Sequence, residues 1–145
     1  MEPNNPPVQV TVTFNPVIAS RRVTFGENAK VEFDNEAPGT VTFTLDVTTA
    51  LQVRFPSNPI QWVRRIDKDA DDGGPVDDHN LLPIDPPRGA TVSRIDDNTT
   101  TVTIASDPNI EKQTFRFYVI VQTMDGRFFG SDPTIVTMRP GDGGT

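Results

Sequence analysis

One peptide bond near the carboxyl end of the chain, Asp132-Pro133, joins two residue types that favour intramolecular cleavage. An aspartate carboxyl can attack, or direct water to, its own backbone carbonyl carbon, and the fully substituted proline nitrogen is a comparatively good leaving group. Where a fold holds the carboxyl against that carbonyl, local geometry supplies the acceleration. The residue types therefore make Asp132-Pro133 a candidate for intramolecular cleavage.

The surroundings of Asp132 depend on the register of the strands beside it. Asp125-Gly126 is the pair that a two-residue type I′ hairpin turn prefers, so Met124 is expected to face Arg127 and Val119 to face Asp132. That side of the sheet would then carry Phe115, Phe117, Val119 and Val121 on one strand and Phe128, Gly130, Thr134 and Val136 on the other.

On this register Asp132 points into the core. Apolar surroundings raise the pKa of a carboxyl and can keep it protonated at neutral pH, a state in which it gives or shares a proton. A single bulge, at Gly130 or Pro133, would instead turn Asp132 outward and leave an ordinary turn residue.

An acidic segment offers a second chemistry. Asp67 to Asp78 places carboxylates at positions 1, 3, 5 and 12 of a calcium-binding loop. Position 6 is Asp72 where such a loop needs glycine, so the competing interpretation is a solvated acidic loop. His79 is the only histidine, so a histidine metal site or a Ser-His-Asp triad would rest on one residue. We expect no resident metal and no cofactor.

Aromatic residues next to arginines are also found in proteins that bind nucleic acid. Phe115, Phe117 and Tyr118 lie beside Arg116 and could stack bases. Their two-residue alternation favours core packing instead, and Trp62 is likewise expected to face the inside of a sandwich.

Composition narrows the classes of function. The chain has 145 residues, with 13 basic and 20 acidic side chains and a net charge of −7, which argues against binding to nucleic acid. Cysteine is absent, which excludes disulfides and thiolate chemistry. No apolar run approaches the roughly 20 residues of a membrane helix, and the start does not read as a secretory signal. These features predict a cytoplasmic protein with no membrane contact.

Strand signals dominate the chain, because short Val-, Thr-, Ile- and Phe-rich stretches alternate with Gly, Pro, Asn and Asp clusters. This pattern predicts a single all-β domain, a two-sheet antiparallel β-sandwich that is immunoglobulin-like or related. The expected strands are 8–14, 17–25, 29–33, 41–45, 51–55, 60–66, 91–95, 100–104, 113–124, 127–131 and 134–138.

The domain is expected to span residues 8–138, between flexible tails at 1–7 and 139–145. Asp96-Asp97-Asn98 predicts a hairpin between its flanking strands. Residues 67–89 form a long acidic loop, rich in Pro and Gly, without periodicity of either kind.

The segment from Phe115 through Asp125-Gly126 to Ser131-Asp132-Pro133, together with Pro38-Gly39-Thr40-Val41-Thr42-Phe43, resembles the DP-EP family of small bacterial β-sandwich proteins. The resemblance covers about two-thirds of the chain, although no Glu-Pro follows Asp132 and the acidic loop has no counterpart. It implies that the protein cuts its own last strand in an aspartic-peptidase-like reaction, with Asp132 as the P1 residue and Pro133 at the start of the released segment.

The resemblance also implies a lysine that captures the Asp132 carbonyl as an isopeptide. Lys112 immediately precedes the expected strand 113–124, and Lys30 on another strand is the alternative amine. In the expected register Val119 faces Asp132, and Lys112 is seven residues from Val119. This separation is roughly 23 Å along a strand, too far for the Lys112 amine to reach Asp132 unless the strand bends sharply.

Two hypotheses of different classes follow. The first is a single-turnover, self-cleaving β-sandwich centred on Asp132-Pro133. The alternative is a non-enzymatic binding module that uses the acidic loop 67–89, with calcium ordering it. A protein partner and self-association are both left open.

Overall fold

Alternating apolar and polar residues build the strands of this protein. The computed structural model describes residues 5–15, 23–25, 30–65, 81–106, 113–130 and 134–139. In β1 (Val8–Phe14), β4 (Gly39–Leu45) and β9 (Thr99–Ile104), every second residue is buried. Successive side chains of a strand point to opposite faces, so each strand turns one apolar face inward. All three predicted strands are confirmed, β1 with its predicted bounds.

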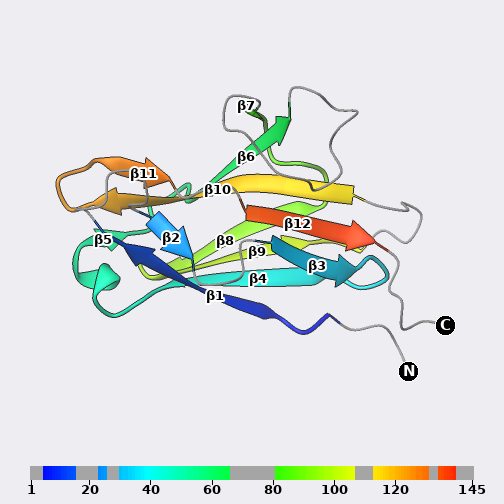
Figure 1. The fold of residues 1–145 in the computed structure, drawn as a ribbon, viewed down its shortest axis with the longest axis horizontal. Helices are drawn as coiled ribbons and strands as arrows, with labels where there is room; N and C mark the ends of the chain where they lie inside the picture. The colour runs from blue at the N-terminus through cyan, green and yellow to red at the C-terminus, as the bar shows by residue number, and fades with distance from the viewer. Residues whose placement is uncertain are drawn as a thin grey trace.

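One sheet has the strand order β2-β1-β4-β9-β8, where β2 is Val23–Phe25 and β8 is Ala90–Asp96 (Figure 1). The β8–β9 connection is the predicted hairpin at Asp96-Asp97-Asn98, with Asp96 paired to Thr99. β1 and β4 run parallel, whereas the other neighbours in this sheet are antiparallel.

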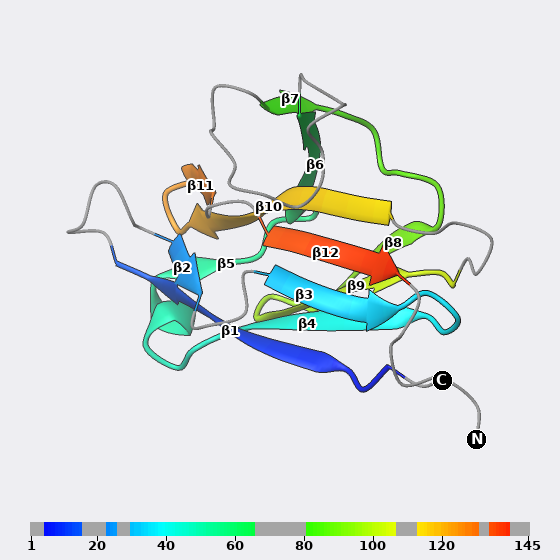
Figure 2. The same cartoon turned by 45° about the vertical axis from the view of Figure 1, so that its right-hand side comes forward.

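The second sheet has the order β3-β12-β10-β6-β7. Its strands are β3 (Lys30–Asp34), β12 (Thr134–Arg139), β10 (Gln113–Thr123), β6 (Ile60–Arg65) and β7 (Leu81–Pro83). β12 lies between β10, its antiparallel partner, and β3, its parallel partner (Figure 2).

The two sheets pack as the predicted sandwich. The neighbours β4-β9-β8 and β6-β10-β12 follow the B-E-D and C-F-G order of immunoglobulin-like domains. Trp62 on β6 is 2% exposed and its ring lies 5.0 Å from that of Phe117, which in turn meets Phe43 of the other sheet at 5.9 Å. The predicted inward position of Trp62 and Phe117 is therefore confirmed, and these aromatic contacts tie the sheets together.

Two short strands extend β10 at one end of the sandwich. β5 (Val53–Arg54) and β11 (Phe128–Gly130) pair with its last residues on opposite sides. A strand was predicted over 51–55, but Thr49–Leu51 form a 3₁₀ turn, η1. The reason is local: the Asp46 carboxylate accepts a hydrogen bond from the Thr49 N–H at 2.7 Å, which satisfies the start of a helical turn.

The acidic stretch 67–89 was predicted to have no regular structure, and this prediction is wrong at Leu81–Pro83, which form β7 on the edge of β6. A run of three residues is too short for a period of two to be recognised. Residues 66–80, with His79 and the calcium-loop pattern, lie outside the described residues.

Both predicted tails contain ordered residues. The Asn5 side chain donates to the Asp34 and Ala37 carbonyls at 2.8 and 3.0 Å, and its oxygen accepts the Asp34 N–H at 2.9 Å. At the other end Arg139 is the last residue of β12 and forms an ion pair of 3.1 Å with Glu32. These contacts fix both ends of the domain to the β3–β4 corner.

Candidate functional site

The predicted cleavage site lies in a gap between two described strands. Asp132 and Pro133 fall in residues 131–133, and Lys112 precedes the first residue of β10; all three lie outside the described residues. The structure therefore describes the strands that frame the bond.

The ladder between β10 and β12 has the register predicted from the sequence. Phe115 faces Val136 and Phe117 faces Thr134. The four side chains are between 0% and 3% exposed, so they lie in the apolar core. A carboxyl held on this side of the sheet would have a raised pKa because burial disfavours its charged form.

The hairpin before it differs from the prediction. The N–H of Thr123 donates to the Arg127 carbonyl at 2.8 Å, so the loop contains three residues, Met124, Asp125 and Gly126. A type I′ turn needs positive φ at both central residues, whereas Gly126 has φ +91° and Asp125 does not have positive φ. The Asp125 carboxylate instead accepts a hydrogen bond from the Thr123 hydroxyl and pairs with Arg127, and these contacts lower its pKa, the Thr123 bond most.

The longer loop reverses the faces of β11. Phe128 and Gly130 were predicted to point inward, and both are exposed. Phe129 points inward instead, with its ring 5.4 Å from that of Phe14. The register rule explains the error, since one extra loop residue moves every side chain of a strand to the other face.

The register changes by one residue between β11 and β12. Gly130 faces Ile120 and Thr134 faces Phe117, so four steps on one strand (134 − 130) match three steps on the other (120 − 117). A bulge at Gly130 or Pro133 is the alternative expected to turn Asp132 outward, and residues 131–133 themselves lie outside the described residues. The irregularity brackets Asp132-Pro133, the bond that the sequence singles out.

Thr134, the first residue of β12, carries an unusual hydroxyl. It is 0% exposed, and its Oγ1 has no hydrogen-bond partner among the described residues. A buried polar group without a partner costs about 1–3 kcal/mol, and each such group asks for an explanation. Alternation predicts the inward side of Thr134, but a missing hydrogen-bond partner is a property of the packed fold and leaves no signal in the sequence.

Of the two candidate lysines, Lys30 begins its strand at the same end of the sheet as Thr134. Lys30 is exposed and faces Ile135 in the parallel β3–β12 pair. Gln113, the residue after Lys112, faces Met138. Met138 lies four residues beyond Thr134, or about 13 Å along the strand.

The outer face of this sheet contains a buried cation. Arg116 is 2% exposed between Val63 on β6 and Ile135 on β12. Since Phe115 and Phe117 point into the sandwich, Arg116 points away from it, and its burial means that this outer face is also covered. The sequence pattern did not reveal this cation, because an arginine in an alternating strand normally faces solvent.

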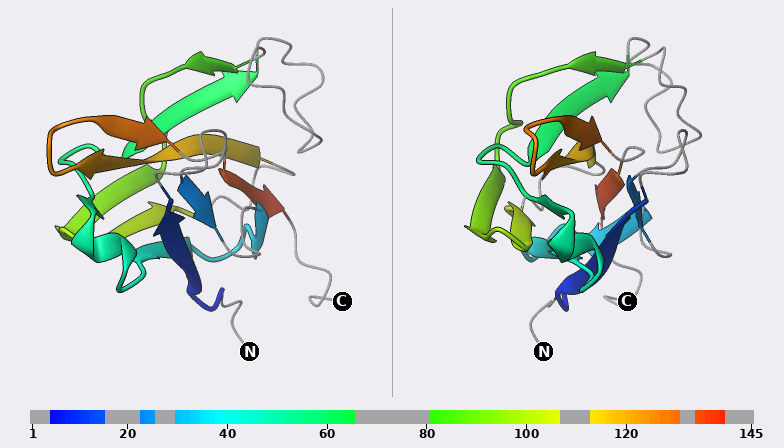
Figure 3. Two further views of the ribbon diagram at one scale, coloured as in Figure 1. Left: turned by 60° about the vertical axis from the view of Figure 1, so that its left-hand side comes forward. Right: turned by 90° about the vertical axis from the view of Figure 1, so that its left-hand side faces the viewer.

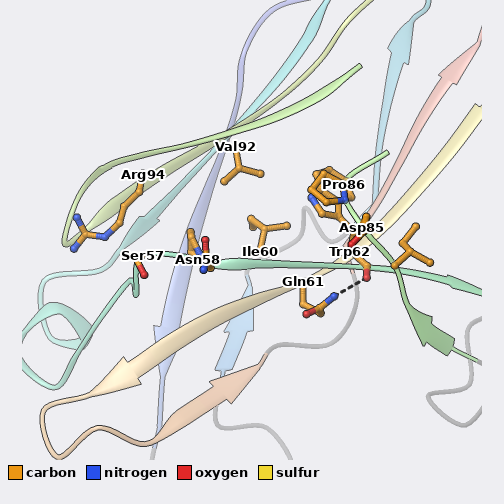
Figure 4. Close-up of a pocket in the computed structure, with 11 residues that line it drawn as sticks. Ser57, Asn58, Ile60, Gln61, Trp62, Asp85, Pro86, Val92 and Arg94 are labelled. Carbon is orange, nitrogen blue, oxygen red and sulfur yellow. Dashed lines mark hydrogen bonds between the residues drawn. The ribbon is translucent and has the colours of Figure 1, made fainter. Parts of the chain in front are cut away.

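A groove of about 390 Å³ lies elsewhere, between the start of β6, the segment after β7, and β8. Figure 4 shows Ile60 and Val92 across its middle, with Arg94 at one end and Asp85 at the other. Arg94 is engaged with Asp97 and with the Phe55 carbonyl at 3.0 Å. Because β6 pairs with the edge of β10 opposite to β12, the groove is separate from the predicted cleavage site.

Three further findings bear on the site. In the ranges that the structure describes, no group of three or more His, Cys, Asp or Glu could hold a metal ion. No helix within those ranges is long and apolar enough to cross a membrane. Comparison with known proteins finds no family model, curated protein or solved structure that matches this chain.

Proposed function

We propose that the protein cleaves its own Asp132-Pro133 bond once, as the resemblance of its Asp-Pro segment to the DP-EP family implies. The observation that carries the proposal is Thr134, a fully buried threonine immediately after Pro133 whose hydroxyl has no hydrogen-bond partner in the described part of the chain. Buried polar groups are normally satisfied. A donor without a partner, on the residue that follows this bond in the sequence, would be available to a group that changes its charge during a reaction.

The chemical step needs only groups of the chain and one water. The Asp132 carboxyl oxygen bonds to the carbon of its own backbone carbonyl, the C–N bond to Pro133 breaks, and the carboxyl proton passes to the proline nitrogen. Water then opens the resulting cyclic anhydride and leaves two carboxyl groups on Asp132. Negative charge develops on the carbonyl oxygen during the attack, and a hydrogen bond from the Thr134 hydroxyl would stabilise it.

Two features of the frame support this reaction. The core-facing residues next to Thr134, Phe117 and Val136, are 0% exposed, and apolar surroundings favour the protonated acid that the step requires. The register changes by one residue between Gly130 and Thr134, so the pairing with β10 is irregular around this bond.

Lys30 is the better amine for an isopeptide with the Asp132 carbonyl. Its partner Ile135 is three residues from Asp132, a path of at most about 11 Å of extended chain. The residue after Lys112 is paired with Met138, at the far end of β12.

In the test, freshly purified protein and Asp132→Ala are kept folded at neutral pH for days. Samples of both are then denatured, and their intact masses are measured. Appearance of fragments 1–132 and 133–145 in the wild type alone is the expected result. A chain that stays whole in both samples would exclude the proposal.

The lysine assignment is tested in the same assay. If the Lys30 amine opens the anhydride in place of water, it forms an amide with the Asp132 carbonyl and fragment 1–132 is lighter by one water than the hydrolysed fragment. Lys30→Arg then abolishes this lighter fragment, while Lys112→Arg leaves it unchanged. The reverse pattern would assign the amine to Lys112.

A further inference from the structure

β8 is the longest edge strand in the described part of the chain. The strands at the ends of the two sheets are β2, β8, β3 and β7. β2 and β7 have three residues each, and β3 has three charged residues among five, whereas β8 has seven residues and contains no Lys or Pro. Short edges, charges and prolines hinder the pairing of a further strand. The right panel of Figure 3 shows β8, in yellow-green, at the outer edge of the molecule. Among these four edges, β8 is the one best suited to accept another strand.

The main chain of β8 directs hydrogen-bonding groups to this edge at two residues. Just before β8, the Gly89 carbonyl accepts a hydrogen bond of 2.8 Å from the first residue after β9. Bonded residues alternate in an antiparallel ladder, so the N–H and C=O groups of Thr91 and Ser93 point to β9, and those of Val92 and Arg94 point away from it. No described strand pairs with this side of β8. The groups of Val92 and Arg94 repeat at the spacing of a strand, which is matched by the main chain of an extended peptide.

The groove between β6 and β8 lies along the same edge. Its middle is lined by Val92 and Ile60, which Figure 4 shows facing each other, and by Ile84. These three side chains pack against the core but are only half-buried, so the described part of the sandwich is partly open here. The volume of about 390 Å³ falls within the ~300–1,000 Å³ of typical ligand sites. A strand added to β8 would place the side chain opposite Val92 on the same side as Val92, which is the side of the groove.

The two ends of the groove carry opposite charges. Arg94 lies at one end and Asp85 at the other, with Val92 between them (Figure 4). Arg94 donates from Nε to the Phe55 carbonyl and from Nη2 to Asp97, and a guanidinium has five N–H donors, so donors remain for a further carboxylate. Asp85 is exposed and forms no ion pair with the other described residues. A strand antiparallel to β8 would therefore fit best with an acidic residue two positions before its apolar residue and a basic residue two positions after it.

We propose that the edge of β8 binds an extended peptide segment of another protein, which adds to the sheet as an antiparallel strand. The segment has the pattern acidic-x-apolar-x-basic, with its apolar side chain between Val92 and Ile60. Hydrogen bonds from its main chain to Val92 and Arg94 provide the affinity, and the groove with its two charged ends provides the sequence preference. One short strand on an open edge binds weakly, so the Kd of an isolated peptide lies between the micromolar and the millimolar range.

The first experiment titrates the isotope-labelled full chain with the end-capped peptide Thr-Glu-Thr-Val-Thr-Lys-Thr, up to about 2 mM, and follows the amide signals by NMR. The signals of Val92 and Arg94 should shift and approach saturation. The same peptide with an N-methylated valine cannot donate to the Val92 carbonyl and should leave both signals unchanged. Equal shifts from the two peptides would overturn the proposal, and so would the absence of any shift at the highest concentration.

The second experiment changes one charge of the groove. Asp85→Lys should weaken binding of the unmethylated peptide by about threefold or more, because an attraction to its lysine becomes a repulsion. The matched control Glu36→Lys makes the same charge change at an exposed position of the β3–β4 corner and should bind like the wild type. An equal loss in both variants would overturn the proposal, and so would a Val92 signal that shifts with protein concentration alone, which would assign the edge to a second copy of the chain. Neither readout depends on cleavage of Asp132-Pro133.

Discussion

Two threonine hydroxyls are buried without a hydrogen-bond partner in the described residues, and their positions differ. Thr134 follows Pro133 at the start of β12, whereas Thr100 lies on β9 in the other sheet. Both side chains are 0% exposed. The stability cost of an unsatisfied hydroxyl is common to both, but only Thr134 is next to the proposed cleavage site in the sequence. The pair therefore separates a structural effect from a functional one.

Replacing Thr134 by valine should stabilise the fold and slow self-cleavage. Valine keeps the branched shape and removes the unsatisfied hydroxyl, a gain of about 1 kcal/mol, or about 2–4 °C in Tm for a domain of this size. Loss of the donor should slow cleavage by on the order of tenfold or more, measured as the rate of appearance of fragment 133–145.

Thr100→Val is the matched control for this change. It should raise Tm by a similar amount and leave the cleavage rate unchanged. Equal cleavage rates in wild type and Thr134→Val would remove the hydroxyl from the mechanism, and slowing in both variants would trace the effect to stability alone.

At the β3–β4 corner, the packing of β3 against β4 depends on a glycine, Gly39, which has no side chain. A Cβ on Gly39 would lie 2.2 Å from Cδ2 of Phe33, so the ring occupies the space that any other residue at this position would need. Gly130, in contrast, would place its Cβ 3.9 Å from that of Tyr118, which is ordinary contact. The close approach of the Phe33 ring to the β4 backbone therefore requires glycine at position 39.

Gly39→Ala should destabilise the protein by about 1–3 kcal/mol, because the Phe33 ring or the backbone must move in a packed core. Gly130→Ala should change the free energy of unfolding by less than about 1 kcal/mol. Urea unfolding of the two variants beside the wild type measures both values. Similar losses in the two would mean that the corner relaxes without cost.

Asp46 connects β1 to the turn that precedes β5. Its carboxylate accepts the Thr49 N–H at 2.7 Å and the Thr13 hydroxyl at 3.0 Å, and these bonds, the Thr49 N–H first, lower its pKa. A lowered pKa in the folded state stabilises the fold above the unfolded pKa of about 4, and that stabilisation is lost as pH falls through the folded pKa.

Asp46→Asn should therefore lower Tm near pH 7, because the amide lacks the charge that strengthens both hydrogen bonds. The difference in Tm between wild type and variant should shrink as pH falls below about 4, since the wild-type carboxyl is then protonated as well. Thermal unfolding from about pH 7 to about pH 3 measures it. A difference that stays constant across this range would show that the ionised carboxyl contributes nothing.

Strands were predictable to the extent that alternation extends over several residues. Val8–Phe14 matches its predicted bounds, while Leu81–Pro83 went unrecognised because three residues carry no period. The hairpin at Asp125-Gly126 was placed correctly but with a loop one residue too short, since a turn dipeptide does not determine which residues beside it pair. The β10–β12 register survived that error because a compensating extra residue lies between Gly130 and Thr134.

At the scale of the whole molecule, the proposed cut would fall before a central strand. β12 is bonded along both edges, to β10 and to β3, and five of its six residues are buried. Figure 1 shows it within the sandwich, next to both partners. Cleavage at Asp132-Pro133 would break one covalent bond and leave these contacts in place. The resemblance implies a released segment, whereas the packing of β12 predicts a segment that stays bound.

Cleaved protein should therefore remain one particle under native conditions. Fragment 133–145 should co-elute with 1–132 in gel filtration and separate only in denaturant, because removing β12 would expose Val136 and Met138 and open the ladder of β10. The cleaved form should also melt at a lower temperature than Asp132→Ala, and its Tm should rise with protein concentration, since its unfolding becomes a dissociation. Recovery of the peptide as a separate species in native buffer would contradict this prediction. It would mean that β12 is held too weakly to be a structural strand, and that release of this strand is itself the consequence of the cut.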